Sequence, residues 1–186
     1  MSPTLILYQE ILVQQFLSCR FESVARFNHM VESFNINTNA WLMHYVYKRL
    51  RFLNNRLASQ FGALAFLAVW HGYHSGYYVC FFNEFITMNF ERDIIAILER
   101  SPMMKPYWEH PAAPILSQAI GYAFMLFWLP HCLMPFIMLK SNLYFPVYAN
   151  TYFILWIFFM GWPLVKGPVK SFLLRGEVRE VEKKKE

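Results

Sequence analysis

The stretch LASQFGALAFLAVWHGYHSGYYVCFFN, residues 57–83, contains no Asp, Glu, Lys or Arg. A transmembrane helix needs about 20 predominantly apolar residues, so this run is long enough to enter a bilayer. Charge-free runs also extend from His110 to Leu139 and from Ser141 to Val165. Backbone inside a bilayer must satisfy its own hydrogen bonds, which favours helix. The three runs together predict an all-α, polytopic transmembrane helical bundle with at least three long membrane helices.

Local signals refine the two later runs. Pro111 and Pro114 disfavour the interior of a helix, so we expect the second membrane helix over residues 116–139. The third run is rich in aromatic residues and contains Trp156 and Trp162. Tryptophan rings concentrate at membrane–water interfaces, and this placement therefore predicts that both rings lie near an interface.

The composition points to the same class of protein. Hydrophobic residues make up 56% of the chain and charged residues 16%, against roughly 45–50% and 25% in typical globular proteins. Aromatic residues reach 19%, which is more than a soluble protein of this size readily buries. This balance excludes intrinsic disorder and a collagen-like repeat. The three cysteines, Cys19, Cys80 and Cys132, are scattered and odd in number, which argues against a disulfide framework and predicts reduced thiols.

Two shorter apolar segments lie in the N-terminal part. Leu5–Leu17 is short and includes Glu10, so it fits an interfacial or buried helix better than a span, and it lacks the basic start of a signal peptide. Between Trp41 and Leu53, apolar residues recur on one helical stripe and basic residues lie off it, which predicts a basic amphipathic helix at a membrane surface. The alternative is a core helix with a solvated charged face. The basic residues concerned are Lys48, Arg49 and Arg51.

The C-terminal segment is strongly charged. Residues 166–186 carry seven Lys or Arg and four Glu, so we expect them to be exposed to water on the cytosolic side. Lys183 and Lys184 match the dilysine signal that coat proteins read for retrieval to the endoplasmic reticulum. The pattern predicts a multi-pass protein of the endoplasmic reticulum membrane that interacts with the coat-protein retrieval machinery. The alternative is that these lysines are only solvated charge.

The first charge-free run creates a conflict in topology. Three simple crossings with a cytosolic tail would place the basic residues before residue 57 on the lumenal side, against the positive-inside tendency. Gly72, Ser75 and Gly76 are able to interrupt a helix. We therefore expect residues 57–83 to form a broken or re-entrant segment that lines a polar cavity.

Two histidines lie beside this expected break. His71 and His74 occupy the most apolar part of the chain, where an ionisable residue is costly and a functional site is the default hypothesis. The alternative is a histidine whose ring is satisfied by a backbone carbonyl. A metal site is a weaker hypothesis: the two rings would share a helix face, but zinc needs three or four donors, and neither a Cys nor Glu84 has suitable spacing.

A second polar group is SFNINTNAW, residues 33–41. Thr38 or Asn39 is expected to cap the helix that follows. Asn35 lies ahead of that cap, and its amide donates and accepts hydrogen bonds without the desolvation cost of a charge. The sequence has no GxSxG motif, no glycine-rich phosphate loop and no basic and aromatic array. No nucleic-acid partner is therefore expected.

Three segments carry a resemblance to a known family: SFNINTNAW at residues 33–41, VYKRLRFLNN at 46–55 and AVWHGYHSGYYVCFFNEF at 68–85. They resemble the C-terminal part of membrane-bound O-acyltransferases, above all the branch that reacylates lysophosphatidylcholine and related lysophospholipids. The resemblance implies a C-terminal portion of that family's helical membrane fold over residues 21–165. Residues 1–20 form an atypical N-terminal segment, and residues 166–186 form the cytosolic basic tail.

The resemblance also implies a reaction and its residues. It assigns a catalytic histidine to His71 and its paired asparagine to Asn35. The implied reaction moves a fatty acyl group from acyl-CoA, as co-substrate, to the free glycerol hydroxyl of a lysophospholipid, with no metal and no permanently bound cofactor. His71 would act as general base, and Asn35 would orient that imidazole or donate a hydrogen bond to the oxyanion. The basic residues at 48, 49 and 51 would meet phosphates of coenzyme A or lipid headgroups.

Two other classes of function stay open at this point. The chain resembles only about the last two-fifths of such acyltransferases, so an inactive fragment or a regulator is one alternative. A proton-coupled transporter is the other, since it also uses histidines and broken helices within the membrane. Such a transporter would normally show an internal repeat and an acidic partner in the membrane, and the sequence shows neither.

Overall fold

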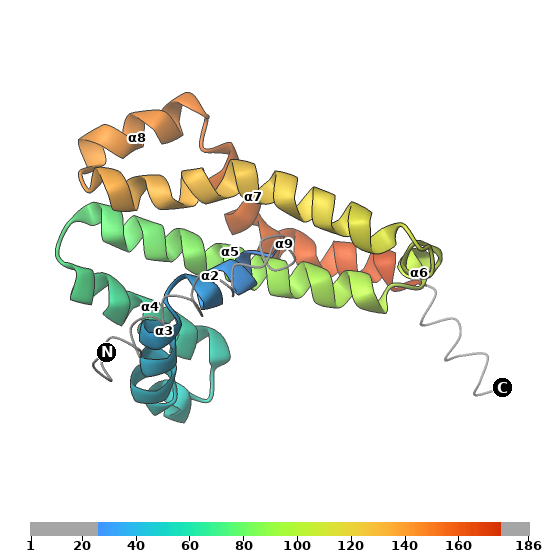
Figure 1. Ribbon diagram of the computed structural model, residues 1–186, viewed down its shortest axis with the longest axis horizontal. Helices are drawn as coiled ribbons and strands as arrows, with labels where there is room; N and C mark the ends of the chain where they lie inside the picture. The colour runs from blue at the N-terminus through green and yellow to red at the C-terminus, as the bar shows by residue number, and fades with distance from the viewer. Residues whose placement is uncertain (1–25, 176–186) are drawn as a thin grey trace, which may run out of the picture.

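The computed structural model describes residues 26–175, except for the side chains of residues 32–34. The N-terminal segment expected over residues 1–20 and the dilysine residues Lys183 and Lys184 lie outside the described part. The elements in chain order, labelled in Figure 1 where there is room, are α2 (Phe27–Phe34), α3 (Ile36–Leu42), the π-helix η1 (Met43–Tyr47), the 3-10 helix η2 (Arg49–Leu53), α4 (Arg56–His71), α5 (Ser75–Arg100), the 3-10 helix η3 (Pro102–Met104), α6 (Lys105–Trp108), α7 (Ala113–Met138), α8 (Ser141–Asn150) and α9 (Ile154–Leu173). All elements between residues 26 and 175 are helical, which confirms the predicted all-α class.

Helix α5 forms the centre of the bundle. It packs against α4, α7 and α9, while α2 and α3 lie beside α4 and the middle of α5 (Figure 1). One apolar core lies between α3, α4 and α5, and a second joins α2, α7 and α9 around Trp128, which is 1% exposed. Cys80 and Cys132 are buried and form no disulfide in the described part of the chain, and Cys19 lies outside that part.

Polar side chains of α5 are buried inside this apolar bundle. Asn83 Nδ2 donates to the hydroxyl of Tyr148 on α8 at 3.1 Å, and that hydroxyl donates to the carbonyl of His131 on α7 at 3.0 Å. Thr87 Oγ1 donates to the carbonyl of Asn83 at 2.7 Å. A buried polar group is costly unless it is hydrogen-bonded, so these contacts specify how α7 and α8 are seated on α5.

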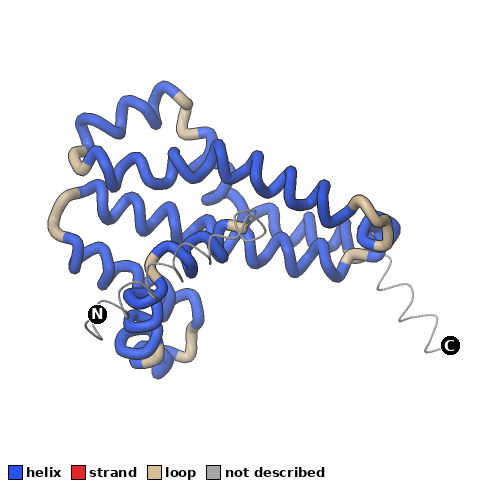
Figure 2. Tube along the Cα trace, viewed as in Figure 1, coloured by secondary structure: helices blue, strands red, loops and turns tan. Residues whose placement is uncertain are grey.

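The prediction of at least three long membrane helices is wrong for the described part of the chain. Among residues 26–175, α7 alone is a single helix both long and apolar enough to cross a bilayer. The consecutive helices α8 and α9 meet the same test only as a pair, and they are bent by 76° at the break between them. The charge-free run over residues 57–83 is divided between α4 and α5 (Figure 2), and α5 continues into a charged half that ends at Arg100. A run without charges therefore does not correspond here to one straight helix.

The predicted amphipathic helix over Trp41–Leu53 is not one regular helix. Regular α-helix ends at Leu42, a π-helical turn follows, and a 3-10 turn completes the segment. Because these turns differ from 3.6 residues per turn, the apolar stripe expected from the sequence is broken, and Leu53 is exposed. The basic residues of the segment are exposed, as the prediction required.

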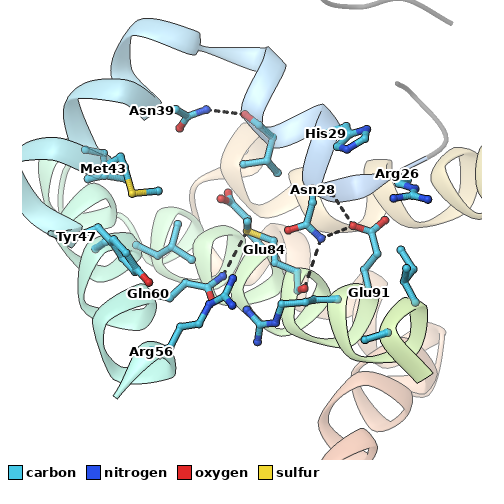
Figure 3. Close-up of a pocket in the computed structure, with 18 of the residues that line it drawn as sticks. Arg26, Asn28, His29, Asn39, Met43, Tyr47, Arg56, Gln60, Glu84 and Glu91 are labelled. Atoms are coloured by element: carbon cyan, nitrogen blue, oxygen red, sulfur yellow. Dashed lines mark hydrogen bonds between the residues drawn. The ribbon is translucent and has the colours of Figure 1, made fainter. Parts of the chain in front are cut away.

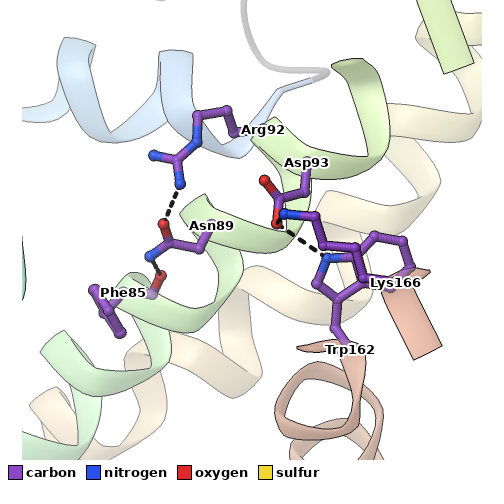
Figure 4. Close-up of polar contacts among 6 residues, drawn as sticks. All are labelled: Phe85, Asn89, Arg92, Asp93, Trp162 and Lys166. Carbon is purple, nitrogen blue, oxygen red and sulfur yellow. Dashed lines mark hydrogen bonds and ion pairs between the residues drawn. The ribbon is translucent and has the colours of Figure 1, made fainter. Parts of the chain in front are cut away.

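Helix α9 extends beyond the expected end of the third run. It passes Lys166 and ends at Leu173, and Lys166 Nζ lies 2.7 Å from Asp93 Oδ2 on α5 (Figure 4). The indole N–H of Trp162 donates to the same carboxylate oxygen at 3.3 Å. Trp162 is therefore buried against α5.

Candidate functional site

The predicted break in residues 57–83 is confirmed at residues 72–74. Helix α4 ends at His71 because Gly72 follows with a φ of +126°, a backbone conformation that favours glycine. The N–H of Gly72 donates to the carbonyl of Val69 at 3.1 Å and closes the last turn of α4. His74 then precedes the first residue of α5. The two histidines are therefore separated by a sharp change of chain direction.

This break removes the geometric basis of the metal hypothesis. His71 ends one helix and His74 precedes another, so they do not stand three residues apart on one helix face. Within residues 26–175, no group of three or more His, Cys, Asp or Glu side chains is placed to hold a metal ion.

The ring of His71 is held in one orientation. Its Nδ1 lies 2.7 Å from the carbonyl oxygen of Leu67, one turn earlier in α4. A carbonyl oxygen only accepts, so Nδ1 carries the proton and Nε2 of the neutral ring keeps its lone pair. The sequence offered the alternative that a backbone carbonyl satisfies this histidine. That is true of Nδ1 only, and Nε2 remains available as a base.

Aromatic rings surround the imidazole on the side of α5 and α7. Its ring centroid is 5.6 Å from Tyr77, 5.2 Å from Phe81 and 5.4 Å from Phe136. His71 is nevertheless exposed among these rings. An exposed base with apolar walls fits a site in which a substrate covers the ring and excludes water.

Gly76 brings α7 to this ring. The N–H of Gly76 donates to the carbonyl of Leu139 at 2.9 Å, immediately after α7. A Cβ atom on residue 76 would lie 2.0 Å from the carbonyl oxygen of Pro135. Only glycine lets the first turn of α5 approach the last turn of α7 so closely. This approach seats Phe136 against His71.

Asn35 has a local role that the sequence did not predict. It is itself the N-cap of α3, and its Oδ1 accepts the N–H of Thr38 at 3.2 Å. The expectation that Thr38 or Asn39 is the cap, with Asn35 ahead of it, is therefore wrong, because α2 continues to Phe34 and α3 begins immediately after. Asn39 instead donates from Nδ2 to the carbonyl of Val31 at 2.6 Å.

The structure links Asn35 and His71 only indirectly. Between the described residues, no hydrogen bond or ring contact joins the two side chains. Helix α3, which Asn35 caps, packs on α4 through Trp41, whose ring centroid is 5.4 Å from that of Trp70. Trp70 is the neighbour of His71 in sequence, so the two predicted site residues belong to packed, adjacent helices.

A cavity of about 620 Å³, lined by apolar as well as polar and charged side chains, lies between α2, α3, η1, α4 and α5 (Figure 3). On α4 the cavity is lined by residues 56, 60, 63 and 64. His71 lies seven residues, or about two turns, after residue 64 and so is on the same face of that helix. The α5 wall of the cavity begins at Glu84, one turn beyond Phe81. The cavity thus lies on the same face of the α4–α5 hairpin as His71. The polar and charged lining residues are Arg26, Asn28, His29, Asn39, Tyr47, Arg56, Gln60, Glu84, Glu91, Arg92 and Glu99.

Glu91 fixes one wall of the cavity. Its carboxylate accepts the N–H of Phe27 at 2.6 Å and the N–H of Asn28 at 2.8 Å, and it also accepts the side-chain amide of Asn28. Arg26, the N-cap of α2, provides no side-chain cap. A carboxylate from α5 therefore supplies the cap that α2 lacks, which holds α2 against the bundle.

Glu84 is the second carboxylate of the cavity and has a different environment. Its side chain is half-buried, and no hydrogen bond or ion pair joins it to any residue from 26 to 175. Burial raises the pKa of the Glu84 carboxyl from its ordinary value to about 7. The guanidinium of Arg92, further along α5, donates to Asn89 Oδ1, and its pKa is lowered by burial and by the neighbouring charge of Arg56.

Sequence reasoning missed Glu91, Arg56 and Arg92, and it considered Glu84 only as a metal ligand. A usable signal was present, because Glu84 and Glu91 are seven residues apart and so share one face of a helix that is otherwise largely apolar. Charged residues at this spacing in an apolar helix indicate a polar face directed inward. The predicted basic residues at 48, 49 and 51 do not line the cavity.

Comparison with known proteins provides an independent line of evidence. The family model of MBOAT, the membrane-bound O-acyltransferase family, matches residues 14–139, which include both Asn35 and His71. A mouse protein named lysophospholipid acyltransferase 5 is 37% identical over 145 residues, covering 76% of this chain and 29% of that protein. The Drosophila melanogaster protein of the same name is 39% identical over 146 residues, covering 70% and 28%. The human one is 38% identical over 145 residues, covering 76% and 29%.

Proposed function

Because the chain belongs to the membrane-bound O-acyltransferase family, we propose that it carries the acyl-transfer centre of a lysophospholipid acyltransferase. The chain spans less than a third of the length of the relatives that it matches. Those relatives are named for lysophospholipid acyl transfer. The proposed reaction moves a fatty acyl group from acyl-CoA to the free glycerol hydroxyl of a lysophospholipid.

The observation that carries the proposal is the state of His71. Its Nδ1–H is bonded to the Leu67 carbonyl, so Nε2 is a lone-pair base at the open end of α4. An alcohol is a poor nucleophile near neutral pH and needs such a base. Nε2 would take the hydroxyl proton as the oxygen attacks the thioester carbonyl carbon. The carbon–sulfur bond then breaks, and the imidazolium returns the proton to the departing thiolate of coenzyme A.

The same geometry favours one of the two roles considered for Asn35. The Leu67 carbonyl already orients the imidazole, so a second orienting group is not required. Asn35 Oδ1 is occupied by the N–H of Thr38, which leaves the Nδ2 amide protons as donors. We assign to Asn35 a hydrogen bond to the thioester oxyanion. A donor of this kind lowers the activation barrier by roughly 3 to 4 kcal/mol in a dry site.

Turnover of variants tests these roles, measured as acyl transfer from oleoyl-CoA to lysophosphatidylcholine in membranes that lack endogenous activity. His71→Ala should lower the rate by about 10² to 10⁴-fold. His110→Ala, in an exposed turn, is the matched control and should retain the rate. Full activity in His71→Ala would refute the proposal.

Asn35→Asp separates capping from catalysis. The aspartate keeps an oxygen for the N–H of Thr38 but removes the amide donor, so the fold should be preserved while turnover falls by about 10² to 10³-fold. Asn37→Asp, at an exposed position of the same helix, is the control. Unchanged turnover in Asn35→Asp would exclude the oxyanion role and leave Asn35 as a cap only.

We further propose residence in the endoplasmic reticulum membrane through retrieval by coat proteins. The support is the Lys183–Lys184 pair within the strongly charged segment of residues 166–186. Replacing both by Ser in a tagged protein should redistribute it to later compartments without changing membrane insertion. Identical localisation of the variant would show that the two lysines are not a retrieval signal.

A further inference from the structure

The proposed reaction places a positive charge on the ring of His71. Nε2 gains the hydroxyl proton as the carbon–oxygen bond forms, and the ring stays charged until that proton leaves with the thiol of coenzyme A. In a Ser-His-Asp triad an aspartate stabilises the corresponding imidazolium. Here Nδ1 faces the neutral carbonyl of Leu67 at 2.7 Å, and no Asp or Glu among the described side chains lies within ion-pair distance of the ring. Another group is therefore needed to stabilise the charge.

Three aromatic rings, Tyr77, Phe81 and Phe136, surround the place where this charge forms, and we call them the aromatic wall. Their centroids lie 5.6, 5.2 and 5.4 Å from that of the His71 ring. All three distances fall within the roughly 6 Å over which the face of an aromatic ring attracts a cation. Trp70, the neighbour of His71 in sequence, is farther away at 6.4 Å.

The inclination of the rings suits this attraction. The planes of Tyr77, Phe81 and Phe136 are tilted by 50°, 49° and 71° from the imidazole plane, so none of them is stacked flat on it. An inclined pair brings the edge of one ring toward the face of the other. The edge of an imidazolium carries its charged N–H groups, and the face of a benzene ring is the negative part of its quadrupole.

The wall is fixed by its own contacts. The ring of Phe136 is 5.0 Å from that of Tyr77 and 6.3 Å from that of Phe81, and Phe81 is buried. Dipoles or quadrupoles that are held in place before a charge develops need no reorganisation when it does. The wall is therefore organised in advance for a charge on the imidazole.

Phe136 belongs to the wall because the end of α7 is held against the start of α5. The carbonyl of Leu139 accepts the N–H of Gly76 at 2.9 Å and the hydroxyl of Ser75 at 3.3 Å. Leu139 has a φ of +63°, which residues with a side chain rarely adopt, and its N–H donates to the carbonyl of Pro135 at 2.8 Å. Strained backbone of this kind persists where the surroundings hold it, and it concentrates at functional sites.

We propose that the aromatic wall stabilises the imidazolium form of His71 by cation–π attraction and so takes the place of a triad carboxylate. This assignment rests on the proposed acyl transfer, in which His71 is the base. Tyr77, Phe81 and Phe136 act through His71 and are positioning residues. Because Phe136 comes from α7, the strength of the base depends on how α7 is seated on α5.

Apolar packing alone is the competing explanation. A wall that only excludes water would work equally well with any apolar side chain of the same shape. Attraction of a cation also depends on the electron density of the ring face. The two explanations therefore separate when the electron density of Phe136 is changed while its shape is nearly kept.

Equilibrium protonation of His71, measured without substrates, makes this comparison. Nitrogen NMR of the histidine side chains in detergent micelles gives the affinity of the ring for a proton, and His71→Gln identifies its signal. With trifluorophenylalanine in place of Phe136, this affinity should fall by about two- to fivefold, and monofluorophenylalanine should give an intermediate loss. Cyclohexylalanine, which has no aromatic face, should lower it at least as much as trifluorination. An affinity that trifluorination leaves unchanged would overturn the proposal, whatever cyclohexylalanine does.

Two control variants exclude indirect effects. Tyr77 is the titratable side chain in ring contact with His71, and His74 contacts Tyr77 in turn at 6.2 Å. Tyr77→Phe removes the phenol but keeps the ring, so the proton affinity of His71 should change less than twofold. Trifluorophenylalanine in place of Phe145, an exposed residue of α8 whose ring contacts Phe153, should leave it unchanged. A loss in either control as large as that at Phe136 would contradict an effect of the ring face.

Turnover separates this assignment from the proposed function. With trifluorinated Phe136, kcat for transfer from oleoyl-CoA to lysophosphatidylcholine should fall by up to about fivefold while both KM values stay the same, because the wall acts on the base. Lower proton affinity in a protein that transfers no acyl group would support the wall and refute only the proposed function. Unchanged proton affinity in a protein that transfers acyl groups would refute only the wall.

Discussion

Glu91→Gln should loosen α2 on the bundle, because this carboxylate accepts the first two N–H groups of the helix. Glu91 is 9% exposed and accepts the N–H groups of Phe27 and Asn28 at 2.6 and 2.8 Å, together with the Asn28 side-chain amide. A glutamine has one oxygen and one NH₂ group. At least one buried N–H would therefore face another donor.

The size of the effect follows from these contacts. A hydrogen bond to a charged group contributes roughly 1.5 to 3 kcal/mol, and a charge at a helix N-terminus contributes about 0.3 to 1 kcal/mol more. Losing one bond and the charge should lower the free energy of local opening of α2 by about 2 to 4 kcal/mol. Amide exchange in α2 should then be faster by roughly 30- to 1000-fold, while exchange in α7 stays unchanged.

Hydrogen–deuterium exchange followed by mass spectrometry measures this directly. Peptides covering Phe27–Phe34 and Ala113–Met138 report the two helices in the same sample. Glu109→Gln, which removes an exposed carboxylate paired with Lys105 at 3.9 Å, is the control and should leave both peptides unchanged. Equal protection of α2 in Glu91→Gln and the unaltered protein would refute the reasoning that this carboxylate docks the helix.

Other substitutions probe the packing and the charge of the same bundle. Gly76→Ala would place a Cβ 2.0 Å from a carbonyl oxygen of α7 and should lower the free energy of unfolding by about 3 kcal/mol. Gly161→Ala is the control: nothing lies within 4 Å of its Cβ, so it should raise the free energy of unfolding by up to about 1 kcal/mol. Equal melting temperatures of the two variants would contradict the close approach. A double-mutant cycle with Asp93→Asn and Lys166→Met should give a coupling of about 1 kcal/mol in thermal unfolding, and zero coupling would show that the ion pair does not join α5 to α9. Burial raises the pKa of Glu84 to about 7, so the carboxylate form is lost as the pH falls below 7. The ionised fraction of Glu84 should therefore fall about tenfold from pH 8 to pH 6, and the carboxylate bands in infrared difference spectra of the unaltered protein against Glu84→Gln would measure this change. The other titratable groups lining this cavity are Arg26, His29, Tyr47, Arg56, Glu91, Arg92 and Glu99.

The amino-acid sequence by itself determined the helical class, the break beside His71 and the family. Each depends on local or compositional information. Long apolar runs without charge favour helix in any surroundings, and a glycine at residue 72 supplies the positive φ that ends α4. The box around His71 identified the residues that carry the resemblance, and the match of the family model over residues 14–139 confirmed it.

The tertiary structure decided which polar groups meet and which face the interior. The distances between Glu91 and the start of α2, or between Asp93 and Lys166, join residues more than 60 positions apart, and no local pattern encodes such pairs. The number of long membrane helices was overpredicted for the same reason, since the absence of charge does not reveal where packing divides a run into two helices. Compensation of buried charge is a property of the assembled bundle: Glu84 and Glu91 look alike in the sequence, and only the fold caps a helix with one and leaves the other open to the cavity.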